Sequence, residues 1–200
     1  MNFLEKLLAA SRGNDSLLCI GLDPDPARMP VDDVLAFNKA IIDCTQDLVC
    51  AYKPNLAFYE ALGIEGMEAL SKTVEYIPDG IPIIGDAKRG DIGNTARAYA
   101  RALYETYGFD AVTLSPYLGH DSITPFLEYE DKGVFVLCRT SNPGSSDFQA
   151  LKVLGTASER EGERPLYIEV ALRCREWNRS ENIGLVVGAT YPRELAEIRG

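Results

Sequence analysis

The amino-acid sequence predicts a single α/β domain of the (β/α)8 TIM-barrel type, with about six βα units present across residues 1–200. Short apolar stretches alternate with longer amphipathic stretches, which is typical of a parallel α/β protein. The expected strand ends recur roughly every 30 residues, which is the size of one βα unit. No glycine-rich nucleotide-binding turn follows the first strand, because residues 20–26 read Ile-Gly-Leu-Asp-Pro-Asp-Pro. A dinucleotide-binding fold is therefore disfavoured.

The expected strands are apolar along their whole length, as in parallel sheets that are covered on both faces. They comprise residues 16–23, 48–55, 81–86, 111–115, 133–140 and 183–190. The expected helices repeat apolar residues at three- and four-residue spacing. The clearest are residues 31–47, 60–76, 95–107 and 165–177.

Composition and charge exclude several classes of protein. Apolar runs fall far short of the ~20 residues that a membrane helix needs, so we expect a cytoplasmic protein with no membrane partner. The formal net charge of −10 disfavours nucleic acid as a partner, and any anionic substrate must be held by a few local groups. The five cysteines form an odd set without a CxxC pair, so we expect them to pack as small apolar residues and to bind no metal.

Charged residues lie at the ends of three successive expected strands. Asp23 follows the first strand, Lys53 lies near the end of the second, and Asp86, Lys88 and Asp91 follow one another from the end of the third. In a barrel the carboxyl ends of the strands form the active site. Residues two apart on an extended strand point the same way, so Asp86 and Lys88 can both project into the barrel mouth.

Charges at strand ends are often solvated and do nothing specific. The joint pattern is more informative, because gathering several charges in a partly buried mouth is costly unless each has a partner. Alternating signs offset that cost, since an attraction across 4 Å is about 4 kcal/mol at an effective dielectric constant of about 20. We therefore expect a fully ionised cluster at this edge of the barrel.

The pattern resembles the orotidine 5′-phosphate decarboxylase family. Asp86, Lys88 and Asp91 fill its DxKxxD signature, and residues 52–55, 114–117 and 140–144 match further segments in the same order. The last of these, Thr-Ser-Asn-Pro-Gly, is similar to the loop of a bacterial and archaeal subgroup. The resemblance extends from about residue 15 to residue 200, and the ordered set of segments is far more specific than DxKxxD alone.

The resemblance implies a role for each matching residue in decarboxylation of orotidine 5′-phosphate to UMP in pyrimidine biosynthesis. Lys88 would protonate C6 of the pyrimidine as carbon dioxide leaves, and Asp86 would lie beside the substrate carboxylate. The resemblance also implies a reaction without a cofactor and a homodimer with shared active sites. The remaining catalytic and substrate-binding positions that it implies are Asp91 from the partner subunit, Thr95 across the dimer interface, Asp23 and Lys53 at the ribose, and Ser141 at the pyrimidine.

Other polar residues have simpler interpretations. His120 is the single histidine and has no serine or cysteine partner in a recognisable motif, so we interpret it as a polar loop residue. Trp177 is expected to be one packed aromatic residue on a solvated helix face. The glycine- and serine-rich residues 144–147 are interpreted as a connecting loop.

The sequence departs from the family in the number of its βα units. A closed barrel needs eight strands, but only about six are recognisable here, so we expect the last two units, which grip the substrate phosphate in relatives, to be absent. A fragment of a longer protein explains this better than a short protein that covers its sheet edges by oligomerising, because exposed edges promote aggregation.

Two other functions stay open from the sequence. A magnesium-dependent sugar-phosphate decarboxylase or aldolase of the same suprafamily shares DxKxxD, but it places an acidic metal ligand where this chain has Lys53, which cannot bind magnesium. A non-catalytic barrel fragment would bind nucleotides without releasing carbon dioxide.

Overall fold

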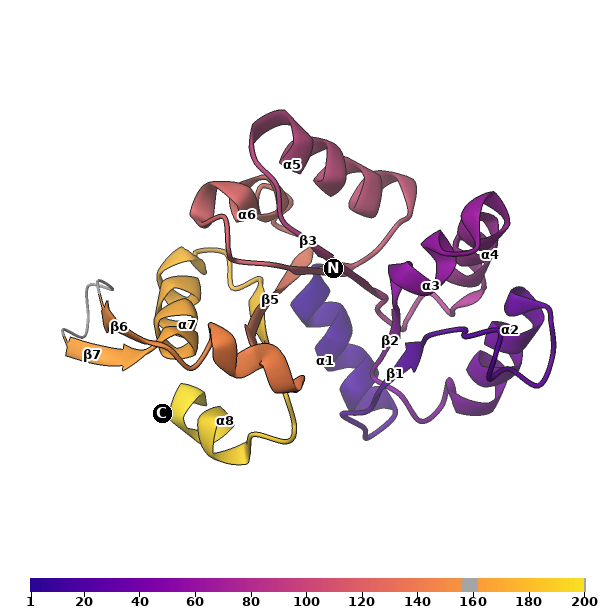
Figure 1. Cartoon of the computed structure of the whole chain (residues 1–200). Coiled ribbons are helices and arrows are strands. Elements are labelled where there is room, and N and C mark those ends of the chain that lie inside the picture. The colour runs from indigo at the N-terminus through magenta and orange to yellow at the C-terminus, as the bar shows by residue number, and fades with distance from the viewer. Residues whose placement is uncertain (156–161, 200) are drawn as a thin grey trace.

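The computed structural model describes residues 1–155 and 162–199, and six parallel strands form its centre (Figure 1). The expected α/β architecture with about six βα units is confirmed. The strands are β1 (Cys19–Leu22), β2 (Ala51–Pro54), β3 (Ile84–Arg89), β4 (Ala111–Leu114), β5 (Gly133–Arg139) and β8 (Ile183–Val187).

These strands lie side by side in chain order. Hydrogen-bonded pairing joins β1 to β2 and runs continuously from β3 through β4 and β5 to β8. Isolated parallel bridges from Tyr52 to Ile83 and from Asn55 to Asp86 connect the two sheets. Because every pair is parallel, the carboxyl ends of all six strands lie at one edge.

Helices cover the outside of the strands, as parallel crossover connections require (Figure 1). Within the described residues, no helix is both long enough and apolar enough to cross a membrane. The α-helices are α1 (Phe3–Gly13), α2 (Val34–Thr45), α3 (Leu56–Glu60), α4 (Gly63–Tyr76), α5 (Gly93–Arg101), α6 (His120–Leu127), α7 (Leu166–Trp177) and α8 (Pro192–Arg199).

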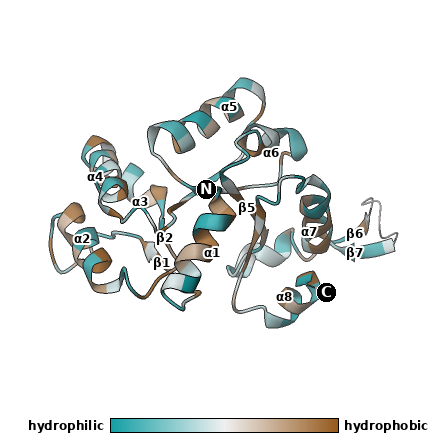
Figure 2. Cartoon of the chain, turned by 180° about the vertical axis from the view of Figure 1, so that it is seen from behind, coloured by the Kyte–Doolittle hydropathy of each residue, from teal (hydrophilic) through white to brown (hydrophobic). Residues whose placement is uncertain are grey.

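The first helix, α1, closes the amino ends of the strands and has hydrophobic and hydrophilic residues side by side (Figure 2). The Phe3 ring packs edge-on against Phe135 of β5, with ring centroids 5.8 Å apart. Lys6 pairs at 2.8 Å with Asp110, directly before β4. Asn14 donates to the Val49 carbonyl, shortly before β2. The helix α1 therefore covers the amino ends of the strands, and the active site is expected at their carboxyl ends.

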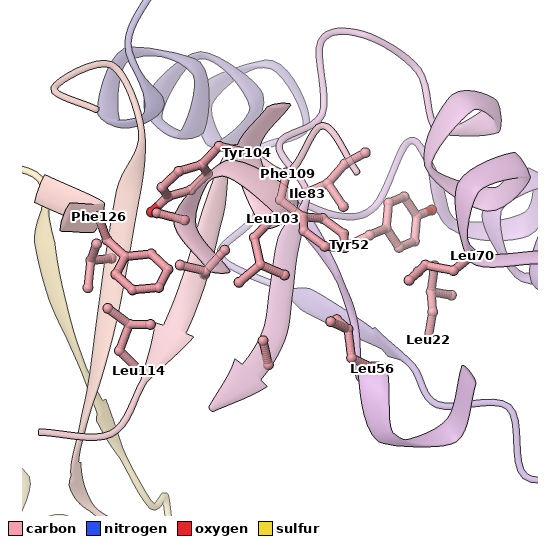
Figure 3. Packing of buried hydrophobic residues seen from close by; sticks show 14 of the residues in the cluster. Leu22, Tyr52, Leu56, Leu70, Ile83, Leu103, Tyr104, Phe109, Leu114 and Phe126 are labelled. Carbon is pink, nitrogen blue, oxygen red and sulfur yellow. The ribbon is translucent and has the colours of Figure 1, made fainter. Parts of the chain in front are cut away.

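The main core lies between the strands and the outer helices. Tyr52, Phe109 and Phe126 are fully buried there, together with leucines from β1, α3 and α4 (Figure 3). The side chains that face the helices alternate along each strand with side chains that face the barrel interior, so the outer face supplies packing and the inner face supplies the site.

Three elements differ from the sequence-based expectation. The helix expected over residues 60–76 begins only at Gly63, whose φ of +66° is readily adopted by glycine, and Glu60 belongs to the separate helix α3. The helix expected over residues 95–107 is α-helical only to Arg101 and continues as the π-helix Ala102–Thr106. An antiparallel hairpin, β6 (Lys152–Gly155) with β7 (Gly162–Pro165), was not predicted, because its strands are short and polar.

Two smaller predictions also need correction. Residues expected as a loop at 144–147 lie in the 3-10 helix Pro143–Asp147. His120 was interpreted as a loop residue, but it is the first residue of α6, and its ring stacks on Trp177 with centroids 4.9 Å apart. Trp177 packs against the main core, as expected for one packed aromatic residue.

Gly85 allows a test of how tightly β3 is packed. A Cβ at Gly85 would lie 2.5 Å from the Phe109 ring, whereas a Cβ at Gly80 would meet nothing within 4 Å. We expect Gly85→Ala to lower the free energy of unfolding by about 1–3 kcal/mol through overpacking. The matched control Gly80→Ala should change it by less than about 0.5 kcal/mol. Urea denaturation measures both, and equal midpoints for the two variants would contradict this packing.

Candidate active site

Asp86 lies at the centre of an ion cluster at the carboxyl edge of the strands. One of its oxygens pairs with Lys53 Nζ of β2 at 3.1 Å, and the other pairs with Lys88 Nζ of β3 at 2.7 Å. The Asp86 side chain is 8% exposed, whereas the Lys88 side chain is 48% exposed. A buried carboxylate thus holds two ammonium groups, and one of them faces solvent.

Thr113 of β4 completes the cluster. Its hydroxyl donates to the same Asp86 oxygen that binds Lys88, at 2.7 Å, and it accepts a hydrogen bond from the Lys88 backbone at 3.0 Å. Thr113 therefore fixes both the carboxylate and the backbone of the lysine. The sequence analysis did not identify Thr113, although a polar residue inside an apolar strand was a usable signal.

The backbone at Lys88 departs from an extended strand. Its φ is +47°, and the pairing of β3 with β4 shifts register between Gly85 and Arg89. A positive φ is uncommon for a residue other than glycine. The contact between Lys88 and Asp86 was expected from strand alternation alone, but here it also depends on this irregular backbone, which Thr113 holds through the Lys88 N–H group.

Electrostatic interactions keep Asp86 charged. Burial is the largest influence and by itself raises the pKa of the carboxyl group. Hydrogen bonds from Lys88 and Thr113 and the charge of Lys53 oppose it, and together they lower the pKa of Asp86 below its ordinary value of 3.8. At neutral pH the cluster is therefore an anion between two cations.

Cys19 of β1 lies near the cluster and stays neutral. The residue is exposed, but neighbouring protein atoms partly desolvate its thiol and raise its pKa to about 11, and the positive charge of Lys53 only partly opposes this effect. A thiol with so high a pKa is a poor nucleophile at neutral pH. Cys19 therefore adds no charge to the cluster.

Arg89 follows Lys88 in the sequence but is held away from the cluster. Its guanidinium pairs with Glu60 of α3, donates to the Ala87 carbonyl at 3.0 Å, and lies 5.3 Å from the centroid of the Tyr99 ring. Each of these contacts engages the arginine on the helix side of β3. Of the Lys88 and Arg89 side chains, only that of Lys88 thus faces the carboxyl edge of the strands, where it can contact a substrate.

The other predicted site residues do not join the cluster within one chain. The Asp91 carboxylate accepts a hydrogen bond from the Ile92 N–H, and Thr95 is exposed in the first turn of α5. Asp23 and Ser141 are also exposed, after β1 and β5 respectively. The structure therefore brings together Lys53, Asp86 and Lys88 and leaves four predicted residues apart, two of which were expected to act on the partner subunit's site.

Within residues 1–155 and 162–199, no group of three or more histidine, cysteine or acidic side chains is arranged to hold a metal ion. The position where a magnesium-dependent relative would carry an acidic ligand is occupied by Lys53, whose ammonium points at Asp86.

Comparisons with known proteins identify the family of the chain. The sequence model of the orotidine 5′-phosphate decarboxylase / HUMPS family matches residues 16–200. Orotidine 5′-phosphate decarboxylase from Dehalococcoides mccartyi is 58% identical over 201 residues, which cover 100% of this chain and 73% of that protein. The enzyme of the same name from Herpetosiphon aurantiacus is 54% identical over 203 residues, covering 98% of this chain and 73% of that protein.

A solved structure is similar over the whole chain. The OMP decarboxylase of Leishmania donovani superposes with a TM-score of 0.88 at 45% sequence identity, covering 100% of this chain and 75% of that one. The sequence match and the structural match both include the strands that carry Lys53, Asp86 and Lys88. The chain therefore belongs to the orotidine 5′-phosphate decarboxylase family.

Proposed function

We propose that this chain is a carboxy-lyase that converts orotidine 5′-phosphate to UMP and carbon dioxide in pyrimidine biosynthesis, with Lys88 as the proton donor. Family membership identifies the reaction. The observation that carries the assignment of residues is the buried Asp86 carboxylate, which holds the Lys53 and Lys88 ammonium groups at the barrel mouth.

The reaction needs a fixed positive charge. When the bond between C6 and the carboxylate breaks, its electron pair stays on C6, and the pyrimidine delocalises it poorly. Enzymes lower barriers by about 8–23 kcal/mol, and without an electron sink most of this must come from preorganised electrostatics and rapid protonation. An ammonium beside C6 serves both purposes, because it stabilises the electron pair and then transfers a proton to it.

Lys88 has the properties that this role requires. Its ammonium is held by Asp86 at 2.7 Å, and its side chain is half exposed toward the mouth. Holding the donor before substrate binds reduces the reorganisation needed during the reaction. After transfer, the neutral amine regains a proton from water. We assign the larger effect to this stabilisation by Lys88, and assign to Asp86 the orientation of both lysines.

A homodimer with shared sites accounts for the charge of the cluster. In one chain, two ammonium groups surround one carboxylate, which leaves a net charge of +1. Asp91 is half-buried just before α5 and Thr95 is exposed in its first turn, where a second subunit could receive them. We propose that Asp91 acts in the partner's site and balances this charge, and that Thr95 contacts the ribose there.

The remaining assignments follow the family resemblance. Asp23 and Lys53 contact the ribose hydroxyls, and Ser141 hydrogen-bonds the pyrimidine. The five cysteines are free thiols, which supports a cytoplasmic, reducing location.

Replacement of Lys88 tests the proposed chemistry. We expect Lys88→Ala to lower kcat by at least about 10³-fold, because the donor and its charge are both removed. Loss of the ultraviolet absorbance of orotidine 5′-phosphate measures the rate. The matched control Lys72→Ala removes an exposed lysine of α4 that pairs only loosely with Glu68, and it should leave the rate unchanged. A Lys88→Ala protein that is folded by circular dichroism and keeps the wild-type rate would refute the role.

Chelation distinguishes this function from the magnesium-dependent alternative. Because Lys53 cannot serve as a metal ligand, we expect the decarboxylation rate to be unchanged after dialysis against EDTA. A rate that falls in EDTA and returns on addition of Mg²⁺ would support a metal-dependent relative. Binding of the nucleotide without any release of carbon dioxide would support a non-catalytic barrel.

A further inference from the structure

Arg139, the last residue of β5, is a buried cation that the proposed chemistry does not use. The residue is 4% exposed and lies at the same edge of the sheet as Lys53 and Lys88. Across the described residues 1–155 and 162–199, it forms no ion pair with a carboxylate. A buried charge without a counter-ion is costly, so other contacts must stabilise it.

Aromatic rings and one hydroxyl supply these contacts. The guanidinium carbon lies 3.9 Å from the centroid of the Tyr191 ring and 5.9 Å from that of Tyr167. Its Nη1 donates to the Ser145 hydroxyl at 2.6 Å, while its Nε has no hydrogen-bond partner. Cation–π contacts to a desolvated arginine are favourable and fix the orientation of the guanidinium plane.

These contacts fix the segment that carries Ser141. Ser145 belongs to the short 3-10 helix Pro143–Asp147, so its bond to Arg139 ties the far side of the loop back to β5. At the near side, Thr140 and Gln149 exchange two hydrogen bonds of 2.8 Å. Ser141 lies between these two attachments, and its side chain forms no hydrogen bond to any residue that the structure describes.

The residues that follow β8 also contact the segment that carries Ser141. The Gly188 N–H donates to the Arg139 carbonyl at 2.7 Å. A Cβ at Gly188 would lie 3.0 Å from the Ser141 Cβ and 3.1 Å from its backbone nitrogen. Ser141 therefore lies against Gly188, and the backbone of Arg139 joins the end of β5 to the residue that follows β8.

We propose that Arg139 is a positioning residue for decarboxylation. It holds residues 140–147 so that the Ser141 hydroxyl is directed at the pyrimidine before substrate arrives. The inference rests on the proposed function, because it uses the assignment of Ser141 to the pyrimidine. Arg139 itself touches no reacting atom in this scheme and acts through Ser145 and the loop.

A double-mutant cycle on kcat/KM tests whether Arg139 acts through Ser141. We expect Ser141→Ala and Arg139→Met each to lower kcat/KM by about 10- to 100-fold. The double variant should lose no more than about threefold beyond the worse single variant, since the two residues serve one contact. Losses that multiply would refute the role of Arg139, as would a wild-type rate in Arg139→Met. A wild-type protein without decarboxylase activity would instead refute the proposed function.

Two further measurements distinguish a positioning role of Arg139 from an effect on the stability of the whole protein. Ser145→Ala removes only the acceptor and should reproduce the non-additive result if Arg139→Met does not fold. Hydrogen exchange should quicken by at least about tenfold at the Ser145 and Gln149 amides in Arg139→Met, while amides of β4 keep their rates. Arg12→Met, an exposed arginine of α1 at the opposite end of the barrel, is the matched control and should change neither readout. Uniformly faster exchange across the whole chain would refute positioning and indicate a stability effect alone.

Discussion

The parallel order of the strands is the constraint on which the rest of the structure depends. It brings the carboxyl ends of β2, β3 and β4 to one edge, where three side chains can meet around Asp86. A carboxylate at that depth is unfavourable on its own, and two ammonium groups with one hydroxyl make it favourable as an anion. The same carboxylate holds the half-exposed Lys88 ammonium at the mouth, so the contacts that stabilise a buried anion also position the proposed proton donor.

Most of the fold could be predicted because its signals are local. Continuous apolar stretches separated by amphipathic ones marked all six parallel strands and the main helices. The failures arose where tertiary contacts decide. The turn into a π-helix after Arg101 leaves no mark in apolar spacing, and the strands of the hairpin β6–β7 are too short and polar to be recognised. The third strand ends about three residues later than expected, because its irregular backbone continues pairing with β4 as far as Arg89.

The site divides in the same way. The sequence was enough to find Lys53, Asp86 and Lys88, because charged residues at the ends of successive expected strands form a pattern in the sequence itself. Thr113 left a weak signal, a polar residue inside an apolar strand, but its role depends on the Asp86 carboxylate that folding brings to it. Arg139 could not be found, because only the folded chain shows its contact with Ser145. Asp91 and Thr95 remain predictions for a different reason, since their proposed partners belong to a second subunit.

The ionisation of Asp86 is the most direct test of this account. Carbon-13 NMR of the assembled protein, with aspartate labelled at the carboxyl carbon, follows its titration, and Asp86→Asn identifies the signal. We expect Asp86 to remain more than half ionised at pH 3.8, the ordinary pKa of an aspartate, and to titrate at higher pH in a Lys88→Met variant. A carboxyl group that is already half protonated above pH 3.8 in the wild-type protein would contradict the claim that the two lysines and Thr113 outweigh burial.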